Sequence, residues 1–179
     1  MKIFTPKLLT SIAAASLALG SATTALAQVS DSEISMITLT FMETIDIAFV
    51  DPVTIADPTP GMPATGEDTF CVAGSGFSGF SITFSNPDPA AVGFVLQPAV
   101  AGTAPILYEV FFKNDLSPGL GIPVAPDSPI LGNVIQASVC TSPADDNAKF
   151  DIEIPFPEWD GRESDGPFTG MLELTVVSE

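Results

Sequence analysis

Residues that could do chemistry are few in this sequence. The 179-residue chain contains no histidine, two cysteines and 22 acidic residues. Without histidine, a Ser/His or Cys/His catalytic pair cannot form, and zinc or copper would lack a usual ligand. No Gly-rich phosphate-binding loop lies between a strand-like and a helix-like segment. The sequence therefore predicts a protein that is not an enzyme and binds no cofactor or metal.

Two acidic stretches are the remaining candidates for a site. Asp145-Asp146-Asn147 offers oxygen ligands for calcium, but Asp and Asn also favour turns for backbone reasons, which is the interpretation we prefer. Trp159 lies among four carboxylates that could flank a stacked sugar: Glu158, Asp160, Glu163 and Asp165. A glycosidase also needs a cleft, and nothing in the sequence indicates one. We therefore predict a solvated acidic loop without catalytic residues, and we keep Trp159 as a candidate ligand contact.

The first 27 residues have the features of a secretory signal peptide. Lys2 and Lys7 precede the apolar run 8–19, and small residues lead to Ala25-Leu26-Ala27. The run is shorter than the roughly 20 residues that a membrane-spanning helix needs, and no later segment approaches that length. We expect residues 1–27 to be removed and the mature chain to be secreted without membrane insertion.

Removal of this leader leaves three basic residues against 22 acidic ones, a balance even more negative than the −17 of the whole chain. A field of that sign repels nucleic acid and anionic membrane surfaces, so we expect neither as a partner. We interpret the charge as keeping an exported chain soluble. A mature chain of roughly 150 residues is long enough for one ordinary domain with a buried core.

Cys71 and Cys140 are the only cysteines in this chain. Since the chain leaves the reducing cytosol, we predict that they form a disulfide. Closing a loop of about 70 residues would stabilise the fold by roughly 4 kcal/mol in the chain-entropy model. The bond would tie an early strand to a late one.

After the leader, the chain shows no helical period. Short segments of alternating apolar and polar residues are separated by Gly- and Pro-rich stretches, which is typical of strands. We expect strands near residues 45–49, 68–73, 80–85, 92–96, 106–113, 130–140, 150–154 and 172–177, with loops at 57–66, 114–129 and 155–167. Gly74-Ser75-Gly76 predicts a hairpin between the second and third strands. The expected fold is all-β, an antiparallel immunoglobulin-like β-sandwich over residues 44–179.

Residues 34–49 form the longest alternating stretch. An odd-numbered apolar stripe runs from Ile37 to Phe49 and is interrupted only by Glu43. As one strand the stretch would be about 50 Å long, more than a small sandwich needs. We therefore predict an N-terminal extension, residues 28–43, that pairs with something other than its own domain. The alternative is that Ile34 to Phe41 is simply the first strand of a complete sandwich.

The order of these parts resembles the spore coat protein U-like family and the related archaic chaperone-usher pilins. After the leader and the alternating extension, the resemblance is carried by five segments: Ile45–Pro52, Thr69–Val72, Gly79–Ser85, Leu107–Val110 and Thr169–Val176. It covers nearly all of the mature chain.

The resemblance implies a sandwich that lacks one edge strand and is completed by a donor strand. A periplasmic chaperone would fill the groove first, and the extension of a neighbouring subunit would fill it after delivery to an outer-membrane usher. The leading hypothesis is thus a secreted structural subunit of a surface fimbria, pilus or coat. Its donor residues would be Ile37, Leu39 and Phe41. It would occupy the periplasm in transit and then the cell surface.

Two other functions remain open at this point. The first is a secreted β-sandwich binding module, for example a carbohydrate-binding adhesin that uses Trp159 and its loop. The second, less favoured, is a hydrolase that uses the same loop. The donor-strand hypothesis differs from both because it requires the extension to act on another copy of the chain.

Overall fold

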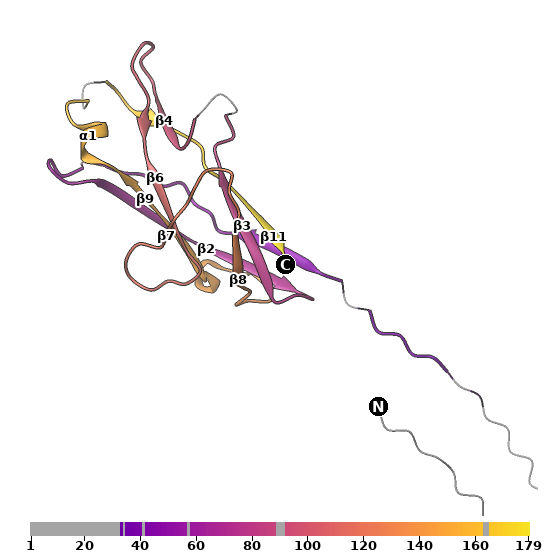
Figure 1. The fold of residues 1–179 in the computed structure, drawn as a ribbon. Helices are drawn as coiled ribbons and strands as arrows, with labels where there is room; N and C mark the ends of the chain where they lie inside the picture. Colours follow the sequence, from indigo (N-terminus) through magenta and orange to yellow (C-terminus); the bar gives the residue numbers. More distant parts are fainter. Residues whose placement is uncertain (1–32, 34, 41, 57, 89–91, 163–164) are drawn as a thin grey trace, which may run out of the picture. The chain divides into compact units, whose positions relative to one another are not determined.

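A computed structural model describes residues 33, 35–40, 42–56, 58–88, 92–162 and 165–179 (Figure 1). The predicted signal peptide and Phe41 lie outside the described residues. The chain divides into two units, Met1–Thr38 and Leu39–Glu179. Within the described part, no helix has the length and apolar character that a membrane span requires.

The larger unit is a sandwich of antiparallel sheets, which confirms the predicted fold class. The first sheet has the order β1-β2-β9-β6-β7. Its strands are β1 (Thr44–Ala48), β2 (Ala64–Ser75), β9 (Ala148–Ile154), β6 (Glu109–Lys113) and β7 (Ile122–Pro123). All of these strands pair in antiparallel register. Figure 1 shows β2, β6 and β9 side by side on one side of the unit.

The opposing layer consists of two three-stranded sheets, β11-β3-β8 and β10-β4-β5. Their strands are β11 (Glu173–Ser178), β3 (Gly79–Ser85), β8 (Ile130–Val134), β10 (Phe168–Thr169), β4 (Val95–Pro98) and β5 (Ile106–Leu107). Two single helical turns, η1 (Pro143–Asp145) and α1 (Phe156–Trp159), lie in the connections. Figure 1 shows β3, β8 and β11 facing the first sheet.

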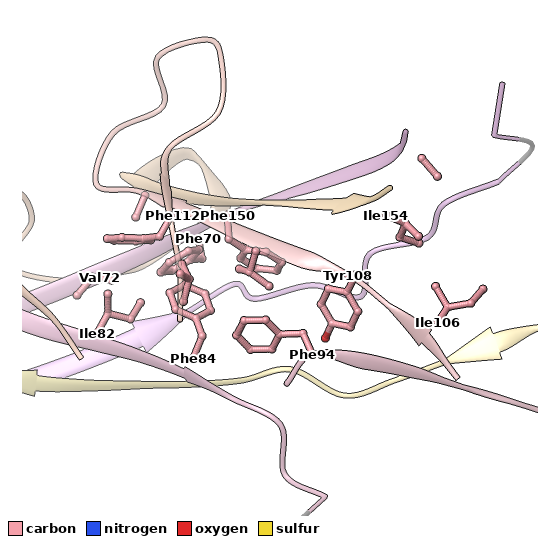
Figure 2. Close-up of a cluster of buried hydrophobic side chains, with 14 of the residues drawn as sticks. Phe70, Val72, Ile82, Phe84, Phe94, Ile106, Tyr108, Phe112, Phe150 and Ile154 are labelled. Atoms are coloured by element: carbon pink, nitrogen blue, oxygen red, sulfur yellow. The ribbon is translucent and has the colours of Figure 1, made fainter. Parts of the chain in front are cut away.

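Aromatic side chains fill the space between the layers (Figure 2). Phe84 of β3 contacts both Phe112 of β6 and Phe150 of β9, with ring centroids 5.7 and 6.1 Å apart. Phe70 of β2 completes this group. Aromatic pairs of this kind add roughly 0.5–1.5 kcal/mol beyond their burial.

The predicted hairpin at Gly74-Ser75-Gly76 is wrong. β2 pairs with β1 and β9, whereas β3 pairs with β11 and β8, so this turn crosses from one sheet to the other. Gly76 has a φ of +89°, a conformation that glycine adopts without strain. Both strands bury one face against the same core, and that alternation looks the same in a hairpin and in a crossing.

Several predicted boundaries also differ from the structure. Among the described residues of the stretch 34–49, only Thr44–Ala48 form a strand, and residues 35–40 belong to none. β2 begins at Ala64, inside a predicted loop, because its first residues pair with the end of β9. The predicted strand 130–140 ends at Val134, and the predicted loops 114–129 and 155–167 contain β7 and α1.

Candidate functional site

The site begins where β1 leaves the edge of β2. Phe49, directly after β1, has a φ of +64°, a left-handed conformation that is rare for a bulky residue. It turns the following segment, of which the structure describes residues 50–56 and 58 and which we call segment 50–58, away from the line of β1. The N–H of Asp51 then donates to Oδ2 of Asp68 on β2, at 2.9 Å. Burial raises the pKa of the Asp68 carboxyl.

Segment 50–58 packs against the core through alternate residues. Val53 and Ile55 are half-buried, whereas Thr54 and Ala56 are exposed. A Cβ at Gly66 of β2 would lie only 2.5 Å from Cγ1 of Val53. Glycine at position 66 is therefore what allows this segment to lie against the first half of β2.

The second wall of the site runs from Pro167 to Leu174 and so reaches the start of β11, which lies at the edge of its sheet. The N–H of Glu179 donates to the carbonyl of Gly79, so these two residues form a hydrogen-bonded pair of the β11–β3 ladder. Hydrogen-bonded pairs alternate in an antiparallel ladder. The backbone groups of Thr175 and Val177 therefore face β3, and those of Leu174 and Val176 face away from it. No hydrogen bond reaches these outward groups from the described part of the chain.

An apolar groove of about 590 Å³ separates the two walls. Residues 50–55 line one side, and residues 167–170 with Leu172 and Leu174 line the other. Core side chains also line it, among them Tyr108, Phe150 and Ile154. Figure 2 shows Tyr108, Ile106 and Ile154 continuing the row of core aromatics in one direction. Burial raises the pKa of Tyr108 to about 12, so this part of the lining is uncharged at neutral pH.

The two ends of β11 differ. At its last residues, Ser178 Oγ lies 3.5 Å from Oε2 of Glu43, just before β1. At the start of β11 the groove is lined by Ile106, Trp159 and Phe168. We call this the aromatic end of the groove.

Trp159 was predicted from the sequence as a candidate ligand contact. The structure buries all but 7% of its surface, and the ring packs edge-on against Phe156 at 5.2 Å. Its indole N–H has no hydrogen-bond partner among the described residues. The neighbouring carboxylates do not converge on it: Glu158 accepts from the N–H of Leu107, and Asp165 pairs with Arg162. Glu163 lies outside the described residues.

The predicted donor residues are exposed where the structure describes them. Ile37 is 91% exposed and Leu39 is 76% exposed. Met36 and Met42, which flank this stretch, are similarly exposed. Full exposure of consecutive large apolar residues is costly for a soluble chain unless a partner covers them.

The predicted disulfide between Cys71 and Cys140 is confirmed, with Cα atoms 5.9 Å apart. It joins β2 to the segment that follows β8. Next to it lies the acidic turn at 145–147, for which we preferred a backbone role. Asp146 accepts a hydrogen bond from the hydroxyl of Thr69, and Asn147 both accepts from and donates to the backbone of Val72.

The first residue of that turn, Asp145, is also engaged by its neighbours. Its Oδ2 accepts hydrogen bonds from the hydroxyl and N–H of Thr141 and from the N–H of Ser142. These bonds, that of the Thr141 side chain first, lower the pKa of the Asp145 carboxyl. Over the described residues, no group of three or more acidic or cysteine side chains could hold a metal ion.

All three basic residues of the predicted mature chain have partners inside the domain. Lys113 donates to the carbonyls of Ser117 and Pro118. Lys149, which is 5% exposed, pairs with Asp151 at 3.2 Å and with Glu67 at 3.4 Å.

Desolvation opposes the charge of Lys149, but the hydrogen bond and charge of Asp151, followed by those of Glu67, more than offset it. As a result, the pKa of Lys149 is raised. The third basic residue, Arg162, lies beside the aromatic end of the groove. Lys149 and Arg162 thus form ion pairs within the domain, whereas Lys113 bonds to backbone carbonyls.

The family resemblance implied a groove, but sequence reasoning missed the residues that line it. The sequence signal that could have identified one wall is the alternation of Val53 and Ile55 within segment 50–58. Pro52 and Pro58 favoured the interpretation of this segment as a loop. Proline removes a backbone donor, but an edge segment does not need every donor. A stretch can therefore be extended, half-buried and rich in proline at once.

The sequence matches no family model and no curated protein. The structure is similar to a solved chain described under "Chaperone-tip adhesin complex is vital for synergistic activation of CFA/I fimbriae biogenesis", with 16% sequence identity and a TM-score of 0.49. The match covers 75% of this chain and 41% of that one, so the present chain spans less than half of its length.

Proposed function

We propose that this protein is a secreted structural subunit of a surface fimbria or coat, and that it assembles by donating a strand to the next copy. In this proposal Ile37, Leu39 and Phe41 of one subunit enter the groove of its neighbour. The observation that carries the proposal is the apolar groove beside the unpaired edge of β11. As part of this proposal, the chain would belong to the spore coat protein U-like family or to the related archaic chaperone-usher pilins.

A donated strand would satisfy both needs of the groove. Its backbone would pair with the outward N–H and C=O groups of Leu174 and Val176, because an added strand continues the ladder of a sheet edge. Its odd-numbered side chains would replace water over the core residues that line the groove. Each large apolar side chain that becomes buried contributes about 1.5–3 kcal/mol.

The donor segment has the composition for this role. Ile37, Leu39 and Phe41 alternate with Thr38 and Thr40, so one face of the strand is apolar and the other is polar. Five extended residues span roughly 17 Å, which is comparable to a short edge strand. The high exposure of Ile37 and Leu39 supports donation in trans over a first strand buried in its own sandwich.

Two partners other than a second copy follow from the proposal. An open groove exposes apolar surface and unpaired backbone before assembly, so a periplasmic chaperone would cap it and an outer-membrane usher would accept the capped subunit. The competing hypothesis of a carbohydrate-binding module is not favoured, because the ring of Trp159 is buried. A sugar-stacking aromatic needs one open face.

The test is a pair of charge substitutions on opposite faces of the donor segment. Leu39→Asp places a carboxylate on the face that enters the groove, where desolvation is costly, and should abolish polymers. Thr40→Asp adds the same charge to the opposite face and should leave them. Size-exclusion chromatography and electron microscopy of both variants give the readout. Polymers of Leu39→Asp as abundant as those of the unmodified chain would overturn the proposal.

A further inference from the structure

One side chain, Arg162, connects the segments that form the aromatic end of the groove. Its guanidinium donates to the carbonyl oxygens of Ala104 and Pro105, the two residues before Ile106. Its Cζ lies 4.8 Å from the centre of the Phe168 ring. The backbone N–H of Arg162 donates to the carbonyl of Trp159 at 3.1 Å. Each contact reaches a groove-lining residue or the chain directly beside one.

These contacts join the two outer strands of the sheet β10-β4-β5, which do not pair directly with each other, to the end of α1. Ile106 begins β5, Phe168 begins β10, and Trp159 ends α1. Asp165 orients the guanidinium through Nε at 3.3 Å. The Arg162 side chain is 20% exposed, so its contacts are shielded from water more than those of a typical surface pair.

We infer that Arg162 is a positioning residue for donor recognition: it holds the aromatic end in the shape that takes the donor's aromatic side chain, Phe41. This inference rests on the proposed function. Aromatic rings favour offset or edge-to-face contact with other rings, and the half-buried ring of Phe168 lines this end of the groove, backed by the buried Trp159. A planar guanidinium that stacks on a ring and donates to two carbonyls at once is a geometry that lysine cannot reproduce.

The assignment also fixes the direction of the donor. The aromatic end lies at the start of β11, and the contact between Ser178 and Glu43 lies at its last residues. With Phe41 at the aromatic end, Ile37 lies nearer Val176, so the donor runs antiparallel to β11.

This direction favours an open polymer. The donor's own domain, which continues from Thr44, then lies beyond the aromatic end of the acceptor. Each subunit would receive at its aromatic end and donate from the end marked by Glu43 and Ser178. Such a head-to-tail contact does not close into a symmetric dimer.

The test measures coupling between Arg162 and single donor positions. The acceptor is the full mature chain carrying Leu39→Asp, with Arg162 intact or changed to Met or Lys. The ligands are synthetic peptides of residues 33–43: the native sequence, Ile37→Ala and Phe41→Ala. Binding is followed by the fluorescence of Trp159, the only tryptophan in the chain, and by the rise in the thermal midpoint.

We expect Arg162→Met to weaken the native peptide by about tenfold or more, which is typical of coupled neighbours, and Arg162→Lys not to restore binding. The same factor should appear with the Ile37→Ala peptide and vanish with the Phe41→Ala peptide. A loss equal for all three peptides, or none, would overturn the role of Arg162. If the native peptide does not bind the acceptor whose Arg162 is intact, that result would instead contradict the proposed function. If the Met variant does not fold, the Lys variant decides by the same comparison.

Discussion

At the scale of single residues, Gly66 decides whether segment 50–58 can form a wall of the groove. A methyl group at Gly66 would overlap the side chain of Val53, so Gly66→Ala should push this wall outward and destabilise the fold by about 1–3 kcal/mol. Gly79→Ala is the matched control, because a Cβ there meets its nearest atom at 3.4 Å. Urea unfolding of both variants gives the free energies. Equal stabilities would show that the segment does not lie against β2 as described.

Two carboxyl groups should affect acid stability with opposite signs. Hydrogen bonds hold the pKa of Asp145 below its usual 3.8, so its charged form stabilises the fold above that pH. This stabilisation is lost as the pH falls through the folded-state pKa. Burial raises the pKa of Asp68 above 3.8, so its charge opposes folding at neutral pH, and this cost disappears in acid.

Asn variants separate these two effects. Asp145→Asn should lower the free energy of unfolding at pH 6 and lose that deficit towards pH 3. Asp68→Asn, whose amide oxygen can still accept from the N–H of Asp51, should raise the free energy of unfolding at pH 6. This increase should disappear in acid. Denaturant titrations at both pH values measure the change. A shift of the same sign in both variants would contradict the assigned environments.

At the scale of elements, the disulfide ties β2 to the segment after β8. Cys71 and Cys140 are 69 residues apart, so replacing both by Ala should cost roughly 4 kcal/mol of stability in the chain-entropy model. Thiol titration of the denatured, unreduced protein should find almost no free thiol. Two reactive thiols per chain, or an unchanged stability of the double variant, would contradict this role.

Strand alternation was the part of the fold that the sequence could predict. The apolar faces of β3 and β9 follow directly from Phe80, Ile82 and Phe84 and from Phe150 and Ile154, because one face of each strand must be buried. Which strands pair was not predictable. The turn at 74–76 joins different sheets, and pairing depends on contacts between residues far apart in sequence, such as Thr69 with Lys149.

The candidate site was predictable only in half. The exposed stripe of Ile37 and Leu39 was visible in the sequence as an alternating apolar pattern longer than its own domain needs. The residues that line the groove were not, because its walls come from 50–58, which Pro52 and Pro58 mark as a loop, and from 167–174, which joins a predicted loop to the start of a predicted strand. A groove forms where segments that are distant in sequence leave a gap between them, and no local sequence pattern encodes that arrangement.

At the scale of the whole molecule, charge should control how fast subunits meet. The predicted mature chain keeps three basic residues, two of them in ion pairs within the domain, against 22 acidic ones, so two copies should repel each other. At physiological ionic strength, added salt shortens the range of that repulsion to about 8–10 Å. Polymerisation should therefore accelerate between 20 and roughly 200 mM NaCl, as followed by light scattering. A rate that falls with salt would indicate that attractive charge pairs drive assembly.

The central claim is that a strand adds to the free edge of β11, and amide hydrogen exchange tests it most directly. In the Leu39→Asp chain, the N–H groups of Leu174 and Val176 face away from β3, whereas that of Thr175 bonds to it. Adding the native peptide of residues 33–43 should slow exchange at Leu174 and Val176 by about tenfold or more and leave Thr175 protected as before. Unchanged exchange at Leu174 and Val176 with the peptide in excess would contradict strand donation.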